Sequence, residues 1–183
     1  MIDGLAEAFL HNEHKILGYK LKPFSCAHYA MLDALKSPLV DRFHLANEYD
    51  LIAFLSICSK DRPFDWSLCI KETVKVAFVK TSHFYRAKTY LKDYLSMPET
   101  YSKHGSADDL FWHTPPPLVM VTKAAHYFGM TLDQCWHYPM GLLCWHIRSH
   151  EELNGGGRII DPEKQRLIVE EAKRAQAEAM NNA

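Results

Sequence analysis

The chain has 183 residues, and its 21 Lys and Arg residues nearly balance its 22 Asp and Glu residues, giving a formal net charge of −1. That balance excludes the strong overall positive field with which many proteins attract nucleic acid or anionic membranes, so we do not expect nucleic acid as a partner. The sequence contains no long apolar run of the kind that spans a bilayer, and no basic leader with an apolar core. We therefore expect a cytoplasmic protein that crosses no membrane.

Two helices are predicted in the first third of the chain, each from a capping residue followed by apolar residues at helical spacing. Ser25 can cap a helix over 25–36, and Asn47 can cap a second helix over 47–58. The alternation of apolar and polar residues that indicates β-strands is nearly absent here and further along the chain. The pattern predicts an all-α fold.

A third predicted helix, 65–95, continues for about thirty residues without Pro or Gly. Helices of globular proteins are usually much shorter, so we expect a bend or a break near Thr81–Ser82. The segment 97–117 is rich in turn residues, and we expect an exposed linker loop there with an extended polyproline conformation. It closes with three prolines, Pro115, Pro116 and Pro117.

Two further helices are predicted over 118–128 and 131–152. Gly129 lies between them and suits the left-handed position that ends a helix. Thr131 starts a capping box at the beginning of the second helix. Pro139 lies inside that second helix and removes one backbone hydrogen bond, so we expect a kink or a split beside it.

The last predicted helix, 162–180, is separated from the others by the glycines 155–157. It is rich in charged residues and alanine and has few large apolar side chains, so it depends on intrinsic propensity more than on packing. We therefore expect a helical body of about five helices over 1–153 and a separable, solvated C-terminal helix within 158–183.

One pair of histidines is a candidate for metal binding. His146 and His150 lie four residues apart in a predicted helix, so both imidazoles project from one face, as a divalent metal ion requires. A zincin-type site also needs Glu directly after the first His, but Ile147 occupies that position. No third ligand lies on the same face. We therefore expect no metal and no other cofactor, and a small His-rich helical metalloprotein is an alternative.

The five cysteines are predicted to be buried free thiols, because they lie in apolar segments and no two have Cys-x-x-Cys spacing. They are Cys26, Cys58, Cys69, Cys135 and Cys144. Histidines close to them in sequence point to other sides of a helix, so no nucleophile–base pair is formed by sequence proximity alone. The motifs GxSxG and GxGxxG and the phosphate-binding loop are also absent. We expect a protein that is not an enzyme.

One segment, 80–93, interleaves basic side chains with aromatic rings, as a protein that binds single-stranded nucleic acid would. The basic residues are Lys80, Arg86, Lys88 and Lys92, and the aromatic residues are Phe84, Tyr85 and Tyr90. Asp93 reduces the positive charge, and rings at this spacing usually pack in the core of a protein. Core packing is the interpretation we favour for these rings.

An aromatic stripe is the strongest sign of partner binding. Trp136, Met140 and Ile147, together with Leu143, recur at helical spacing and form one face, most of which is expected to pack in the body's own core. Nearby tryptophans and prolines add more apolar surface than a small body needs, which predicts a groove for a partner's helix or extended segment. Its predicted lining is Trp112, Pro115, Pro116, Pro117, Trp136, Met140 and Trp145.

Two stretches carry a longer pattern. The stretch 115–156, "PPPLVMVTKAAHYFGMTLDQCWHYPMGLLCWHIRSHEELNGG", has an apolar helix, a Gly-Met-Thr-Leu-Asp turn, a Trp and a Pro, and a helix that ends at glycines. It resembles the C-terminal half of tail assembly proteins of long-tailed, siphovirus-like bacteriophages. The stretch 16–40, "ILGYKLKPFSCAHYAMLDALKSPLV", resembles the opening segment of small proteins of phage tail and head–tail modules. The pattern positions of the first block are Trp136, Pro139, Met140, Trp145 and Gly155.

The resemblance implies a non-enzymatic, chaperone-like assembly protein in the host cytoplasm. Such a protein covers the helical tape-measure protein while tail-tube subunits polymerise around it, because a tape measure exposes amphipathic helical surface before the tube forms. Tape-measure and tail subunits are then the expected partners, and homo-oligomers are compatible with this function. A structural subunit of the phage tail or neck, found in the virion, is the alternative.

Overall fold

The computed structural model describes residues 13–41, 45–65, 74–95, 100–101, 115–155, 158–159 and 167. Within these ranges most residues are helical, and the strands are two-residue segments in two small antiparallel pairs. The predicted all-α class is confirmed. Among the helices in these ranges, none is both long enough and apolar enough to cross a bilayer.

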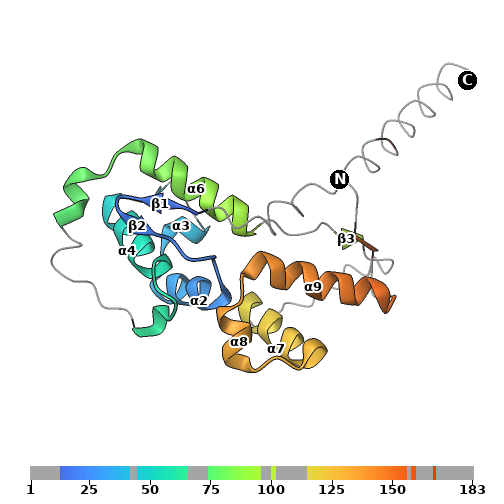
Figure 1. Ribbon diagram of the computed structural model, residues 1–183. Coiled ribbons are helices and arrows are strands. Elements are labelled where there is room, and N and C mark those ends of the chain that lie inside the picture. Colours follow the sequence, from blue (N-terminus) through green and yellow to red (C-terminus); the bar gives the residue numbers. More distant parts are fainter. Residues whose placement is uncertain are drawn as a thin grey trace, which may run out of the picture.

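The first part of the chain forms a short hairpin followed by helices (Figure 1). Its elements are β1 (Lys15–Ile16), β2 (Tyr19–Lys20), α2 (Cys26–Ala34), α3 (Pro38–Asp41), α4 (Glu48–Cys58) and the 3₁₀ helix η2 (Pro63–Asp65). Ser25 caps α2 and Asn47 caps α4, and both caps are reciprocal capping boxes. Both helix predictions are confirmed. The hairpin and α3 are too short to leave a periodic pattern in the sequence.

The predicted helix over 65–95 is divided. A 3₁₀ helix, η3 (Lys75–Phe78), precedes α6 (Thr81–Leu95), and the extended backbone of Val79 lies between them. The break near Thr81 is confirmed, but a continuous helix through 75–80 is wrong. Valines recur through this stretch and have lower helix propensity than unbranched residues, which favours the break. Residues 66–73 lie outside the described residues.

The second part of the chain contains three helices and two short strands. The elements are β3 (Thr100–Tyr101), α7 (Pro116–Phe128), α8 (Leu132–His137), α9 (Met140–Leu153) and β4 (Arg158–Ile159). Gly129 ends α7 with a φ of 64°, and Pro139 separates α8 from α9, so the predicted stop and the predicted split are both confirmed. Helix α7 starts two residues earlier than predicted.

The prolines at the start of α7 correct the predicted linker loop. Pro116 and Pro117 are the first two residues of the helix rather than part of an extended loop. The first turn of a helix tolerates proline, because its N–H groups have no partner within the helix. Residues 102–114, including Trp112, lie outside the described residues.

The short strands β3 and β4 pair antiparallel, with Thr100 opposite Ile159. This pairing joins the first residues of the predicted C-terminal unit to the segment 97–117. The predicted helix over 162–180 lies outside the described residues apart from Leu167, so its separability stays a prediction.

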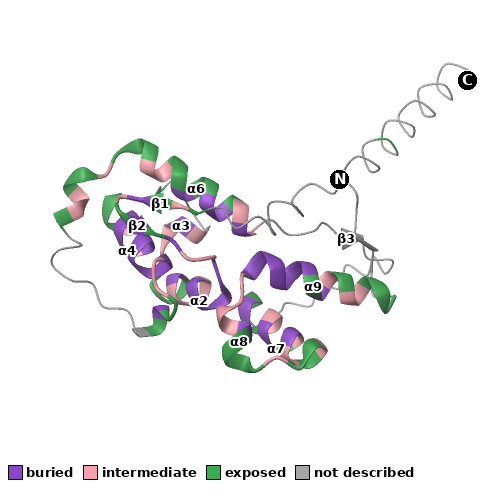
Figure 2. Cartoon of the chain, in the orientation of Figure 1, coloured by how far each residue is buried: buried purple, intermediate pink, exposed green. Residues whose placement is uncertain are grey.

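The core is built around the ring of Tyr90, which has no exposed surface. The rings of Phe24, Phe54 and Tyr94 meet it edge-on, an arrangement that aromatic pairs prefer. Its hydroxyl donates a hydrogen bond of 2.7 Å to the carbonyl of Lys22, so the buried polar atom is satisfied. Figure 2 shows buried residues along α2 and α4 and around the first turns of α9.

The two stretches that carry the phage resemblance pack against each other. Helix α2 of the first stretch contacts α7 and α8 of the second. The amide of Met140 donates a hydrogen bond of 2.7 Å to the carbonyl of Phe24, and Ser25 and Pro139 form an isolated antiparallel bridge. These contacts hold α2, α8 and the start of α9 together.

Candidate partner-binding surface

The structure separates the residues that the sequence places in one groove. Met140 and Trp145 are each only 3% exposed, and Pro117 is also buried. Pro115 and Pro116 are exposed at the start of α7. The buried residues are therefore parts of the body rather than of an exposed groove. The physical reason lies at Pro139: it starts a new helix, α9, whose first turns are covered on several sides.

Trp136 is partly buried against the core, and its exposed neighbours define a small apolar surface around it. The ring of Phe64 in η2 meets the ring of Trp136 edge-on, with 6.2 Å between their centroids. Phe64 is 53% exposed, and Leu132, one helical turn before Trp136, is 60% exposed. We call Phe64, Leu132 and Trp136 the Phe64–Trp136 surface. Its residues come from η2 and α8; the end of η2 at Asp65 and the start of α8 at Leu132 are 67 positions apart in the sequence.

Backbone contacts hold the two halves of this surface in place. The Nε2 atom of His28 donates a hydrogen bond of 2.8 Å to the carbonyl of Lys60, four residues before Phe64. On the other side, Thr131 and Gln134 form the capping box that starts α8. These bonds place the two rings on well-fixed backbone, which limits the entropy that a partner must remove on binding.

An ion pair lies beside this surface, between Arg62, the residue before η2, and Asp133 of α8. A guanidinium nitrogen of Arg62 lies 3.5 Å from a carboxylate oxygen of Asp133. Both side chains are about two thirds exposed, 69% and 64%, so water and salt weaken the pair. Its role is to give the apolar surface a polar rim, as protein interfaces commonly have.

His28 is buried and holds its hydrogen bonds only in the neutral form. Its Nδ1 accepts from the amide of Ser25 at 3.1 Å, so the proton of the neutral ring lies on Nε2, which faces Lys60. The pKa of His28 is lowered to about 4, mainly by burial; the hydrogen bond to the Lys60 carbonyl and the charge of Asp61 oppose this shift, and the nearby His137 adds to it. The ring is therefore neutral at pH 7.

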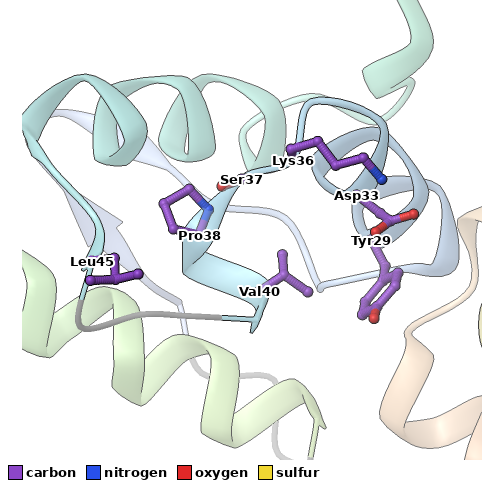
Figure 3. A pocket seen from close by; sticks show the side chains of 7 residues that line it. All are labelled: Tyr29, Asp33, Lys36, Ser37, Pro38, Val40 and Leu45. Carbon is purple, nitrogen blue, oxygen red and sulfur yellow. The ribbon is translucent and has the colours of Figure 1, made fainter.

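A second accessible feature is an open pocket beside α2 and α3, with a volume of about 730 Å³. Figure 3 shows a polar end, formed by Tyr29, Asp33 and Lys36, and an apolar end that includes Pro38 and Leu45. Its size falls in the range of pockets that hold small ligands or partner side chains. The stretch that forms it, up to Val40, is the first of the two stretches with phage resemblance.

The two histidines of the metal prediction contact aromatic rings. His150 stacks on Tyr127 with 4.3 Å between centroids, and His146 lies edge-on to Phe128 at 6.1 Å. Within the described ranges, no three side chains of His, Cys, Asp or Glu are grouped so that they could hold a metal ion. Because His146 and His150 lie four residues apart on one face of α9, both imidazoles pack against Tyr127 and Phe128 at the end of α7.

The cysteines that the structure describes are free and buried, as predicted. They are Cys26, Cys58, Cys135 and Cys144. Desolvation raises the pKa of the Cys26 thiol to about 12 and raises the pKa of the Cys144 thiol as well. Thiols with raised pKa values are poor nucleophiles, because the thiolate is the reactive form. These residues act as small apolar groups of the core.

Comparison of the chain with protein-family models, with curated proteins and with solved structures gave no match.

Sequence reasoning missed two residues of the Phe64–Trp136 surface and the residue that supports it. Leu132 lies four residues before Trp136, at the spacing of the predicted stripe, but the stripe as predicted begins at Trp136. Phe64 stands alone in a turn, and nothing in the sequence pairs it with Trp136. The support from His28 does have a signal, because Ser25 and His28 have the spacing of a capping box, with His in the place of the usual Glu or Gln.

Proposed function

We propose that this protein is a non-enzymatic, chaperone-like assembly protein of a long-tailed bacteriophage. It binds helical segments of the tape-measure protein, or tail-tube subunits, in the host cytoplasm while the tail forms. The identity rests on the resemblance of the stretches 16–40 and 115–156. Their close packing through α2, α7 and α8 supports reading them as parts of one functional unit.

The observation that carries the binding role is the Phe64–Trp136 surface. Large aromatic side chains on fixed backbone contribute most to binding energy in protein interfaces, especially when a polar rim surrounds them. Phe64 and Trp136 are two such rings, and Arg62 and Asp133 supply charged groups beside them. An amphipathic helix of a partner can cover this surface with its apolar face.

The pocket beside α2 and α3 offers a second point of contact in this proposal. Its apolar end, near Pro38 and Leu45, fits a single apolar side chain, and its polar end fits the backbone or a charged group of an extended segment. A partner that uses both features would bind by separate contacts, which raises the effective concentration of the second contact once the first is made.

The test is binding of purified tape-measure segments to variants of the surface. Phe64→Ala and Trp136→Ala should each weaken binding by roughly 2 kcal/mol, about thirtyfold, because each removes a large ring from the contact. Tyr49→Ala is the matched control, since Tyr49 is a similarly exposed ring on α4. Circular dichroism and melting curves for each variant separate loss of binding from loss of folding.

Normal binding by folded Phe64→Ala and Trp136→Ala variants would remove the surface from the proposal. A second measurement decides between the assembly protein and the alternative, a structural subunit of the tail or neck. An assembly chaperone is absent from purified virions, whereas mass spectrometry would find a structural subunit in them at a fixed number of copies.

A further inference from the structure

The near-zero net charge of the chain conceals a strong separation of charge. The segments 13–20 and 74–95 together carry seven basic and two acidic residues, which leaves fourteen basic and twenty acidic residues elsewhere. The basic residues are Lys15, Lys20, Lys75, Lys80, Arg86, Lys88 and Lys92. All are exposed except Lys75, which is half-buried. We call them the basic surface.

The two segments form one surface because the hairpin of β1 and β2 lies beside α6 (Figure 1). Side chains also join the hairpin to η3 and α6. A guanidinium nitrogen of Arg86 donates a hydrogen bond of 2.7 Å to the carbonyl of Lys15. The ammonium of Lys75 lies 3.7 Å from the centre of the Tyr19 ring, a cation–π contact. These contacts hold basic side chains from both segments side by side.

The two acidic residues of this region cancel only part of its charge, since they face seven basic residues. Asp93 lies 2.9 Å from the imidazole of His14 and is only 15% exposed, so it faces inward. Glu13 pairs with Lys20 at the edge of the hairpin. The positive field is also visible at His83, whose pKa is lowered by desolvation first and then by Arg86 and Lys80.

The solvent side of α6 has an ordered arrangement. Tyr85, Lys88 and Lys92 are spaced i, i+3 and i+7, so they form one row along the exposed face that Figure 2 shows on this helix. Tyr85 is 69% exposed and supplies apolar area at one end of the row. A partner helix can pair with this row if it carries Glu or Asp residues spaced to reach the two lysines and an apolar residue spaced to reach the ring.

The positions of the rings weigh against nucleic acid as the ligand. A single strand needs a platform of successive exposed rings on which its bases stack. Tyr90 is buried in the core and Phe84 is half-buried, so of the three rings in the segment 80–93 only Tyr85 is well exposed. The structure thereby confirms core packing for Tyr90 and leaves the basic side chains without that platform.

We propose that the basic surface binds an acidic helical segment of a partner protein. Carboxylates of that segment pair with Lys88 and Lys92, and its apolar residues contact Tyr85. This proposal rests on the proposed function in one respect: it takes the partner to be a protein that is not yet assembled into the tail. Because the charged groups are exposed, the attraction depends on salt and acts mainly on the rate of association.

The experiment measures fluorescence anisotropy with three labelled probes at low and at high salt. The probes are a helical peptide of Glu, Leu and Ala, the same peptide with Gln in place of Glu, and a single-stranded oligothymidine. The variant is Lys88→Glu/Lys92→Glu, which reverses two exposed charges. Lys22→Glu is the control, because the Lys22 side chain is 41% exposed and pairs with Asp61, outside both the basic surface and the pocket beside α2 and α3.

The acidic peptide should bind the wild-type protein, lose at least tenfold in affinity in Lys88→Glu/Lys92→Glu, and keep its affinity in Lys22→Glu. The Gln peptide should bind at least tenfold more weakly than the Glu peptide. Equal binding of the two peptides, or no effect of the charge reversal, would overturn the proposal. So would oligothymidine binding tighter than the acidic peptide, since the surface would then serve nucleic acid.

Failure of the proposed function gives a different result. If the protein has no role in tail assembly but the acidic peptide still discriminates between Lys88→Glu/Lys92→Glu and Lys22→Glu, the basic surface stands and only its partner changes. If tail assembly requires Phe64 and Trp136 but the peptide fails to bind, the proposed function stands and the basic surface does not take part in it.

Discussion

The starts of α2 and α6 use the same histidine contact in opposite surroundings. At each, a histidine three residues into the helix accepts a hydrogen bond through Nδ1 from the amide of the capping position, at 3.1 Å for His28 and at 3.0 Å for His83. His28 is buried and its ring also reaches Lys60, whereas His83 is partly exposed. The same local motif thus links α2 to the backbone at Lys60 through a buried histidine, whereas at α6 it only caps the helix at the surface.

The difference shows that burial, rather than the motif itself, decides what such a histidine contributes. In water, the lost hydrogen bond of a cap is replaced by solvent, but a buried donor or acceptor without a partner keeps its full desolvation cost. The first position of the motif also differs. The hydroxyl of Ser25 accepts a hydrogen bond of 3.4 Å from the amide of His28, whereas Lys80 has no acceptor in its side chain.

The largest effect is expected for His28→Ala. The substitution leaves the amide of Ser25 and the carbonyl of Lys60 without this partner and opens a cavity beside Phe24, whose ring stacks on the imidazole at 5.9 Å. We expect a loss of about 3 kcal/mol or more in the free energy of unfolding, measured by urea denaturation. A loss below about 1 kcal/mol would show that the buried histidine is no more important than an exposed cap.

The second largest effect is a loss of stability at acidic pH. Because the pKa of His28 falls from 6.5 to about 4 on folding, only the unfolded chain binds this proton between those values. The stability that comes from keeping His28 neutral in the folded state is therefore fully present above pH 6.5 and is lost as the pH falls towards 4. Its upper limit is about 3 kcal/mol, and urea denaturation at a series of pH values measures it.

The variant His28→Gln separates this effect from other acid-sensitive groups. A Gln side chain can accept from Ser25 and donate to Lys60, but it does not titrate in this range. Its stability should therefore depend less on pH between 4 and 6.5 than that of the wild-type protein. Parallel curves for the two proteins would assign the acid sensitivity to groups other than His28.

The helices with capping residues were predictable because their signals are local. Ser25, Asn47, Gly129 and Pro139 act through neighbouring residues, and each begins, ends or divides a helix as the sequence indicates. The prolines before Leu118 were misread, since the same residue type favours both an extended loop and the first turn of a helix. Only the packing of α7 decides between the two.

The candidate surface was only partly predictable because it depends on contacts between distant residues. Trp136 was identified from an apolar stripe, but the stripe cannot tell which of its members face solvent once Pro139 divides the helix. The exposed Phe64 belongs to a turn that His28 holds through Lys60. That contact spans 32 positions in the sequence, and no periodic pattern records it.

A smaller effect is expected for His83→Ala. The amide of Lys80 loses its side-chain acceptor but can turn to water, so the cost should be about 0.5–1 kcal/mol, as for other exposed caps. Denaturation curves of His83→Ala and His28→Ala, measured together at pH 7, give the comparison directly. Equal losses at the two positions would contradict the view that burial sets the size of the contribution.

The smallest effect is a gain, expected for Lys80→Ser. Serine at this position would complete the capping box at the start of α6, because its hydroxyl can accept from the amide of His83 as Ser25 accepts from His28. The gain should be about 0.5 kcal/mol in the free energy of unfolding. Lys80→Ala is the matched control, since it removes the same positive charge and offers no acceptor. Serine and alanine variants of equal stability would mean that the missing hydroxyl does not limit α6, and that Ser25 owes its effect to the buried setting of α2 alone.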